Sequence, residues 1–263
     1  MAQQRMLKQY DKDMRSKLSR MFYEDSDFFN FGYYGPETRS QKEASENLVR
    51  ELLSFIPEKS GNILDVACGL GATTRLISEY YPPSQITAIN LSETQLERAR
   101  ENAPGCTFLY MDAAKLDFPD RSFDNIICVE AAFHFNTRQQ FLREAYRVLK
   151  PGGRIVMSDI LYRRSLHFLY GKGMPSENFM RTPARYLARL EDVGFTSCRV
   201  IDATKESWDA FLNQQRVWFK QARAAGRLSR TEYFYGYLLA KMWRLFGNWA
   251  LRYYLLVEAQ KPV

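Results

Sequence analysis

Short apolar segments that alternate with helical segments constrain the fold of this chain more than any other feature of its sequence. We predict five buried strands, each bounded by Gly, Pro or polar residues, at 62–68, 85–91, 106–110, 123–129 and 154–160. Helical spacing places helices at 73–80, 92–102 and 138–149. Strands that alternate with helices predict a parallel, doubly wound sheet covered on both faces, because each crossover places a helix against the sheet.

The two ends of the chain add further elements to this pattern. Before the first strand we expect a marginal helix over 1–20, an aromatic loop over 22–36 and a helix over 40–56. After the fifth strand we expect a helix over 183–194 and strands over 196–203 and 252–260. The last two strands are separated by an aromatic stretch, 205–249, that is too long for an ordinary connection and has mostly helical spacing.

The fold expected is therefore α/β, with a doubly wound, mostly parallel seven-stranded sheet. An N-terminal helical and aromatic segment precedes the sheet, and a helical lid insertion interrupts its C-terminal part. The segments expected are an N-terminal lid, the ligand-binding core, a second lid segment with a completing helix and strand, the aromatic helical insertion and a final strand. Their expected bounds are 1–60, 61–162, 163–204, 205–250 and 251–263.

Composition excludes several classes of protein. The net charge is +7, from 37 Lys and Arg against 30 Asp and Glu, but the basic residues form no block and match no RNA-binding signature. We therefore expect no nucleic-acid partner. The four cysteines are widely spaced, which predicts neither a disulfide scaffold nor a metal site. No apolar run is long enough to span a bilayer, so we expect a cytoplasmic protein without integral membrane contact.

The first strand and the turn that follows it, from Ile63 to Gly71, indicate a ligand site. Ligands of doubly wound sheets bind beyond the carboxyl ends of the strands, and glycine lets the backbone pass close to them. A dinucleotide site would need Gly or Ala where this chain has Thr74. Asp65 would repel a pyrophosphate but attract a cationic ligand, which favours a cofactor that carries an ammonium and a sulfonium.

Four ordered motifs, LDVACGLG, AINLSETQLERAR, DAAKLDFPDRSFD and LKPGGRIVMSD, carry a family resemblance. Over residues 62–160 they resemble the class I S-adenosylmethionine-dependent methyltransferases, which have a Rossmann-like fold. The FGYYG and VEAAFHF segments resemble the small-molecule members of that family more narrowly. These include sugar and macrolide O-methyltransferases of natural-product pathways and, more distantly, tocopherol and sterol C-methyltransferases.

The resemblance implies a set of residues that bind S-adenosylmethionine and its product S-adenosylhomocysteine. Four match the motif beneath the methionine moiety: Asp65, Ala67, Gly69 and Gly71. Three are expected near the ribose: Asn90, which stands where many relatives have an acid, Ser92 and Gln95. Two are expected at the adenine: Asp112 and Ala113. Three more are assigned to the cofactor site: Tyr33 and Tyr34, in the segment expected to fold over the cofactor, and Glu130 after the fourth strand.

Some of these residues also have an ordinary structural interpretation. Ser92 and Gln95 fit a capping box at the start of a helix, which would leave them fewer hydrogen bonds for a ribose. The structural alternative for Asp65 is that it caps a nearby turn, and the alternative for Asp112 is that it is a solvated loop residue. Tyr33 and Tyr34 would only pack on the body of the protein.

By the same resemblance, His134 is the candidate base, with Asp159 as its orienting partner, because histidine titrates near neutral pH and can take a proton from a hydroxyl. The alternative is a packed histidine that shapes the pocket. Glu130 with nearby aromatic residues could instead stabilise a carbocation in C-methylation. His167 lies in an aromatic segment that favours packing.

The function expected is methyl transfer to a bulky, largely apolar small molecule, with O-methylation favoured. C- or N-methylation of a prenylated, terpenoid or indole-like acceptor is the alternative, and a catalytically silent binding protein is the alternative of another class. The aromatic stretch at 205–249 could line an acceptor pocket, form its own core or touch a membrane surface. The sequence gives no indication of the oligomeric state.

Overall fold

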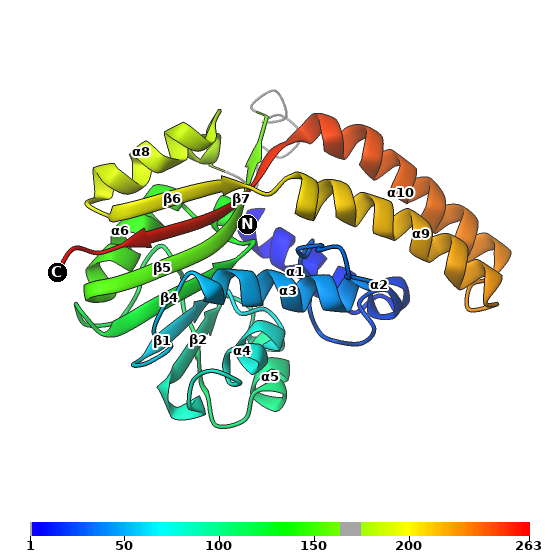
Figure 1. Ribbon diagram of the computed structural model, residues 1–263. Helices are drawn as coiled ribbons and strands as arrows, with labels where there is room; N and C mark the ends of the chain where they lie inside the picture. The colour runs from blue at the N-terminus through cyan, green and yellow to red at the C-terminus, as the bar shows by residue number, and fades with distance from the viewer. Residues whose placement is uncertain (1, 164–174) are drawn as a thin grey trace.

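In the computed structural model, which describes residues 2–163 and 175–263, seven strands form one sheet (Figure 1). The strands are β1 (Ile63–Val66), β2 (Ile86–Asn90), β3 (Thr107–Tyr110), β4 (Phe123–Val129), β5 (Leu149–Tyr162), β6 (Thr196–Asp202) and β7 (Leu251–Gln260). Their order across the sheet is β3-β2-β1-β4-β5-β7-β6. The first five are parallel, and β7 lies antiparallel between β5 and β6, so the predicted mostly parallel, seven-stranded sheet is confirmed.

Helices cover both faces of this sheet. The described helices are α1 (Ala2–Met14), α2 (Lys17–Phe22), α3 (Gln41–Ser54), α4 (Ala72–Ile77), α5 (Glu93–Asn102), α6 (Arg138–Val148), α8 (Pro183–Val193), α9 (Ala210–Ala224) and α10 (Arg230–Ala250). Short turns of other helix types are η1 (Pro83–Gln85), η2 (Ala132–His134), η4 (Ser176–Asn178) and η5 (Lys205–Asp209).

Alternate residues along the strands face opposite layers of helices. On β4, Ile127 packs in the apolar cluster that contains α3 and α4, whereas Ile126 and Cys128 pack in the cluster that contains α6 and α8. Because successive side chains of a strand point to opposite faces, both faces need apolar residues. That requirement explains why the strands read as nearly continuous apolar runs in the sequence.

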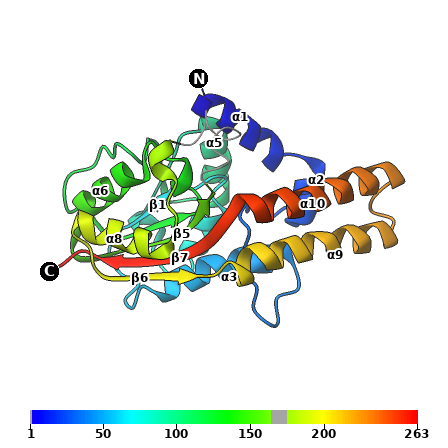
Figure 2. The same ribbon diagram turned by 90° about the horizontal axis from the view of Figure 1, so that it is seen from above.

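The aromatic stretch after β6 forms a helical hairpin. The helices α9 and α10 run antiparallel to each other and project away from the sheet (Figure 2). Aromatic contacts tie the base of the hairpin to the N-terminal segment, with ring centroids 4.9 Å apart for Phe31 and Trp208 and 5.4 Å apart for Phe22 and Trp218. The N-terminal segment and the hairpin therefore share one apolar core with the sheet.

Two local features differ from the sequence-based expectation. The strand β5 begins at Leu149 and includes the Lys150–Gly153 segment, which we expected to separate a helix from a strand. That segment is held by the C-terminal residues, because Gly152 N donates to Lys261 O and Lys261 N donates to Gly153 O, both at 2.9 Å. His167 and part of the predicted 163–204 segment lie outside the described residues. None of the described helices is both long and apolar enough to cross a bilayer.

Candidate active site

The turn between β1 and α4 forms the floor of the site. Gly69 and Gly71 both have positive φ, +56° and +83°, a conformation that favours glycine. A Cβ on Gly71 would lie 2.7 Å from the Cα of Ala99, so only glycine lets α4 begin this close to α5. A Cβ on Gly69 would have only the Cε atom of Met14 within reach, at 4.0 Å, because Gly69 borders open space.

A pocket opens above this turn at the carboxyl ends of β1, β2 and β4. Its empty space, including the open solvent at its mouth, is about 1070 Å³. Eight of the predicted site residues line it: Asp65, Ala67, Gly69, Asn90, Gln95, Ala113, Glu130 and His134. The opposite wall comes from the N-terminal segment: Tyr10, Met14, Asp27, Phe28, Phe29 and Asn30.

Asp65 is a buried carboxylate at the end of β1. Its Oδ2 atom accepts a hydrogen bond from the Thr74 hydroxyl at 2.7 Å, and no Lys or Arg of the described chain pairs with it. Burial raises the pKa of Asp65 to about 7, and the Thr74 bond opposes that rise only in part. A buried carboxylate that lacks a cation and borders a pocket is suited to bind a cationic ligand group.

At the end of β2, three side chains form a hydrogen-bonded chain. Asn90 Nδ2 donates to Gln95 Oε1 at 2.7 Å, and Gln95 Nε2 donates to Asp11 Oδ1 at 2.6 Å. Ser92 caps α5 through Gln95 N at 3.3 Å, and its hydroxyl also donates to Asp11 at 3.3 Å. The capping role of Ser92 is therefore present, and the helix α1 brings a carboxylate to the residues expected near a ribose.

Five predicted cofactor residues lie outside the pocket lining: Gly71 and Ser92, described above, and Asp112, Tyr33 and Tyr34. Asp112 accepts a hydrogen bond from Ala114 N at 2.9 Å and so caps its own loop, although its neighbour Ala113 lines the pocket. Tyr33 N donates to Ala44 O at 2.8 Å, and the Tyr34 hydroxyl donates to Gln41 Oε1. The structure therefore does not bring Tyr33 and Tyr34 to the pocket. The four residues Asp27, Phe28, Phe29 and Asn30, a few positions earlier, take that place.

His134 lies in the pocket wall at the end of η2. The Tyr10 hydroxyl and His134 Nε2 are hydrogen-bonded at 2.9 Å, and the buried Nδ1 atom has no hydrogen-bond partner in the structure. Burial, and secondly the positive charge of Arg138, lower the pKa of His134 to about 3. The ring is therefore neutral at physiological pH, and Nε2 can be reached by a hydroxyl group, but the lowered pKa makes His134 a weaker base than the near-neutral histidine that the prediction assumed.

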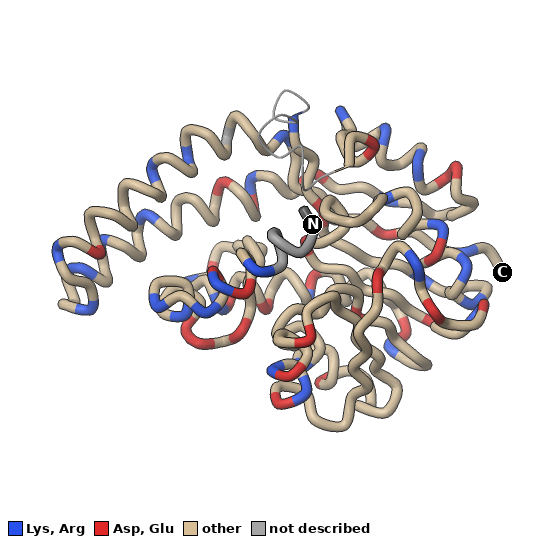
Figure 3. Tube along the Cα trace, turned by 180° about the vertical axis from the view of Figure 1, so that it is seen from behind, with Lys and Arg blue, Asp and Glu red and all other residues tan. Residues whose placement is uncertain are grey.

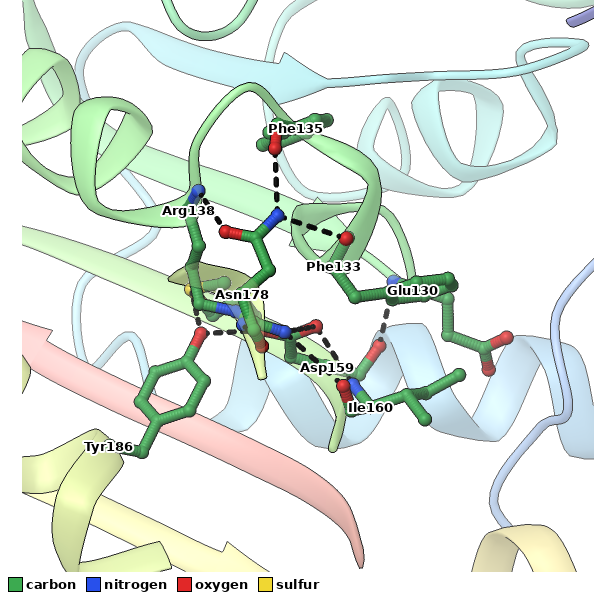
Figure 4. Close-up of polar contacts among 10 residues, drawn as sticks. Glu130, Phe133, Phe135, Arg138, Asp159, Ile160, Asn178 and Tyr186 are labelled. Carbon is green, nitrogen blue, oxygen red and sulfur yellow. Dashed lines mark hydrogen bonds and ion pairs between the residues drawn. The ribbon is translucent and has the colours of Figure 1, made fainter. Parts of the chain in front are cut away.

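Asp159 does not orient His134, contrary to the prediction. Its carboxylate binds Arg138 at 2.6 Å, accepts a hydrogen bond from the Tyr186 hydroxyl at 2.8 Å and accepts another from Ile160 N at 2.8 Å (Figure 4). Arg138 and Asp159 are 2% and 0% exposed. A buried carboxylate needs a cation and donors close by, and Arg138 meets that need more completely than a neutral imidazole can.

The same network still fixes the segment that carries His134. Arg138 Nη1 donates to Asn178 O at 2.5 Å, and Arg138 N donates to Asn178 Oδ1 at 2.8 Å. Asn178 Nδ2 then donates to the carbonyls of Phe133 and Phe135, at 3.1 and 2.7 Å (Figure 4). These two residues flank His134, so the buried ion pair positions the histidine through the backbone.

Glu130 follows β4 and lines the pocket between the sheet and the N-terminal segment. Its Oε1 atom accepts hydrogen bonds from Phe31 N at 2.7 Å and from the Tyr254 hydroxyl at 2.5 Å. Burial raises the pKa of Glu130 to about 8, despite these two donors. The side chain is therefore mostly protonated at neutral pH and points away from the Arg138 network (Figure 4).

The sequence-based reasoning missed Tyr10, Asp11 and Met14, which α1 brings to the site. It also missed Arg138 and Asn178. Each of these residues is far in sequence from the residue it contacts, as Tyr10 is from His134, 124 positions away. The one signal that the sequence offered for the α1 residues was the helix itself. It has few apolar residues, so apolar packing alone does not explain why it lies against the body of the protein.

Comparison with known proteins shows a domain match over the pocket-forming part of the chain. Residues 64–157 match the family described as a methyltransferase domain. A curated relative, the 27-O-demethylrifamycin SV methyltransferase of Amycolatopsis mediterranei (strain S699), is 34% identical over 49% of this chain and 50% of its own length. The 2-methyl-6-phytyl-1,4-hydroquinone methyltransferase of Synechocystis sp. is 34% identical over 51% of this chain and 44% of its own length. The chain thus spans about half the length of these relatives.

Solved structures share the fold at low sequence identity. A phosphoethanolamine N-methyltransferase 2 from Haemonchus contortus, solved with S-adenosylhomocysteine, has a TM-score of 0.72 at 19% identity over 96% of this chain and 60% of its own. The cyclase SpnF has a TM-score of 0.70 at 20% identity over 95% of this chain and 93% of its own. The domain match identifies residues 64–157 as a methyltransferase domain, and the strand order gives the chain the fold of these solved structures.

Proposed function

We propose that this protein transfers the methyl group of S-adenosylmethionine to a hydroxyl of a bulky, largely apolar small molecule. One observation supports this proposal above all others. A single pocket holds an unpaired buried carboxylate, Asp65, above the glycine turn and a neutral histidine, His134, whose Nε2 atom already meets a hydroxyl group. The first feature suits the cofactor and the second suits a hydroxyl acceptor.

The residues of the pocket fit the cofactor. Asp65 offers a negative charge to the ammonium of the methionine part, and Gly69 leaves the room that a side chain would fill. Gln95 and Asp11 offer hydrogen-bonding groups for ribose hydroxyls, and Ala113 and Met111 line the part of the pocket suited to adenine. When bound, S-adenosylmethionine supplies a methyl group on a positively charged sulfur.

The residues of the chain would then align the acceptor, exclude water and accept a proton. The apolar side chains of Phe28, Phe29 and Phe135 line the pocket, and α1 contributes Tyr10 to its wall. His134 would take the proton from the acceptor hydroxyl at Nε2 as the oxygen–carbon bond forms. Orienting the acceptor oxygen toward the methyl group removes most of the entropic part of the barrier.

The charge state of Glu130 favours hydroxyl methylation over alkene methylation. A carboxylate is one group that can stabilise a carbocation, and burial keeps Glu130 mostly protonated at neutral pH, so Glu130 would not supply that negative charge. The names of the relatives agree with a ring-bearing acceptor, since one acts on a demethylrifamycin and the other on a phytylated hydroquinone. The fold alone does not require methyl transfer, because the related structure SpnF is named as a cyclase.

Calorimetric titration with S-adenosylhomocysteine, with NADH as a control ligand, tests the cofactor directly. The product is stable, so no acceptor is needed. We expect micromolar binding of S-adenosylhomocysteine, no binding of NADH and loss of binding in Asp65→Asn. Failure of the unmodified protein to bind S-adenosylhomocysteine in the presence of candidate acceptors as well as without them would refute the proposal.

The affinity for S-adenosylhomocysteine should rise between pH 6 and pH 8. Below a pKa of about 7 Asp65 is protonated, and the protonated form cannot pair with the ammonium of the ligand. At pH 6 only about a tenth of the free protein carries the charge, so the affinity should be about five- to tenfold lower than at pH 8. Titrations at both pH values check this. Glu130→Gln should keep the dependence, and Asp65→Asn should lose it.

Asp11→Asn should weaken S-adenosylhomocysteine binding about tenfold or more. The carboxylate holds Gln95 and Ser92, and it can accept hydrogen bonds from ribose hydroxyls where Asn90 offers only an amide. Hydrogen bonds to charged groups contribute roughly 1.5–3 kcal/mol, which sets the size of the effect. Asp13→Asn is the matched control, because Asp13 lies on the same helix but binds only Gln9 at the surface. Tighter binding by Asp11→Asn would instead identify Asp11 as a competitor of the ligand.

A further inference from the structure

The helix α10 packs on the rest of the protein through its small residues. A Cβ on Gly236 would lie 2.2 Å from Phe219 Cε1, and a Cβ on Gly247 would lie 2.5 Å from Trp208 Cζ2. Ala240, between them on the same face, is buried. These small residues let α10 approach α9 and η5 closely, and they leave its large side chains on the other face.

The outer face of α10 is a continuous apolar surface. Nine of the 21 residues in the helix are large apolar side chains exposed to solvent, among them Phe234 at 65%, Leu245 at 74% and Phe246 at 63%. With 100° between successive residues, these side chains cover about half of the circumference, from Phe234 round to Trp243. One charged residue of α10, Glu232 in its first turn, lies within this arc and pairs with Lys17, and Lys241 borders the arc.

This arrangement inverts the usual pattern of a surface helix. In a soluble protein the large apolar side chains of an amphipathic helix face the core, and exposed apolar patches of this extent mark interaction sites. Here the hairpin projects from the sheet, and the described part of the chain leaves the outer face of α10 uncovered (Figures 1 and 2). The sequence of α10 therefore fits a helix that contacts something other than its own protein.

The hairpin also carries most of the net positive charge of the protein. Residues 210–250 contain seven basic residues and one acidic residue, in a chain whose net charge is +7. The single acid, Glu232, pairs with Lys17 at 2.7 Å. Along the projecting helices, blue segments (Lys and Arg) are accordingly more frequent than red ones (Asp and Glu) (Figure 3). A second copy of the chain would bring the same excess of positive charge to a shared interface, whereas an anionic surface is complementary to it.

We propose that the outer face of α10 inserts into the interfacial region of a lipid bilayer that contains anionic headgroups. Trp, Tyr, Phe and Leu on one face, with Lys and Arg at its border, are the side chains that suit a helix lying in the plane of a membrane surface. Trp243 and Trp249 are half exposed on this face, at 50% and 48%. Lys241 lies beside it, placed to meet lipid phosphates, and Arg244 lies further round toward α9, where its Nη1 donates to Asn213 Oδ1 at 3.4 Å.

Vesicle flotation of the full chain tests this proposal. The probes are vesicles of phosphatidylcholine alone and of phosphatidylcholine mixed with phosphatidylglycerol. We expect binding to the mixed vesicles, about tenfold weaker binding to phosphatidylcholine alone, and loss of about a hundredfold or more in Leu238→Gln/Leu245→Gln. Lys241→Gln/Arg244→Gln should reduce binding to the mixed vesicles and not to phosphatidylcholine.

Controls separate docking from folding and from the cofactor site. Tyr110→Gln removes another exposed aromatic residue, 62% exposed on β3, and should bind vesicles as the unmodified protein does. Every variant should bind S-adenosylhomocysteine as the unmodified protein does, which checks that the cofactor site is intact. Vesicle flotation itself needs neither cofactor nor acceptor, so its result is distinguishable from a failure of the proposed function. Absence of vesicle binding by the unmodified protein would overturn the proposal. The proposal would also be overturned if light scattering showed a dimer that Leu238→Gln/Leu245→Gln dissociates, and the unmodified protein bound no vesicles.

Discussion

Arg138→Met is expected to lower the free energy of unfolding by about 3–5 kcal/mol. The substitution keeps an unbranched side chain but removes the cation that binds Asp159, which is fully buried and 2.6 Å away. It also removes the donor to Asn178 O and so loosens the backbone around His134. Chemical denaturation followed by circular dichroism measures the effect.

Arg100→Met is the matched control for that experiment. Arg100 pairs with Glu93 on the surface of α5, where the two side chains are 45% and 54% exposed. Exposed ion pairs contribute about 1 kcal/mol or less, so this variant should stay close to the unmodified protein. Equal effects of the two substitutions would show that the buried pair of Arg138 and Asp159 does not hold the structure as we describe.

His134→Ala is expected to reduce the rate of methyl transfer by roughly two to four orders of magnitude while the affinity for S-adenosylhomocysteine is kept. The reason is the loss of Nε2, the atom that meets a hydroxyl group in the structure. The measurement is transfer of a labelled methyl group from S-adenosylmethionine to hydroxylated acceptors. Acceptors of the kinds named for the relatives, a demethylrifamycin and a phytylated hydroquinone, form the first panel.

Tyr10→Phe distinguishes a base from a residue that merely shapes the pocket. It removes the hydroxyl from His134 Nε2 but leaves the imidazole and the aromatic packing in place, so turnover should change by only a few fold. A drop of only a few fold in His134→Ala would reject the base and leave His134 a shaping role. An equally large drop in both variants would assign the hydroxyl contact itself to the reaction.

The sheet was largely predictable because its signals are local. The strand at 123–129 has the predicted bounds, and the other six differ from prediction by a few residues at their ends. A strand buried on both faces must be apolar along its whole length, and Pro and Gly mark where it stops. The glycine turn was predictable for the same reason, since a left-handed residue such as Gly71 cannot readily be replaced.

The candidate site was predictable where a residue lies near the carboxyl end of a strand or within a few positions after it. Asp65, Asn90 and Glu130 line the pocket because each ends, or directly follows, a strand of the parallel sheet. The pairing of His134 with Asp159 was wrong because position along the sheet did not reveal a competing cation, Arg138, on the next helix. Tyr33 and Tyr34 were placed at the pocket by resemblance, and the path of the loop puts earlier residues there.

The sequence by itself determined the strands, the turn and the chemical types of residue at the carboxyl edge of the sheet, since short-range sterics and apolar patterning specify them. Only the tertiary structure decided which side chains meet across long stretches of chain, such as Asp11 with Gln95 or Arg138 with Asp159. It also decided which face of α10 is buried. Periodicity shows that a helix has an apolar face, but the close approach of neighbouring backbones decides whether large or small residues turn inward.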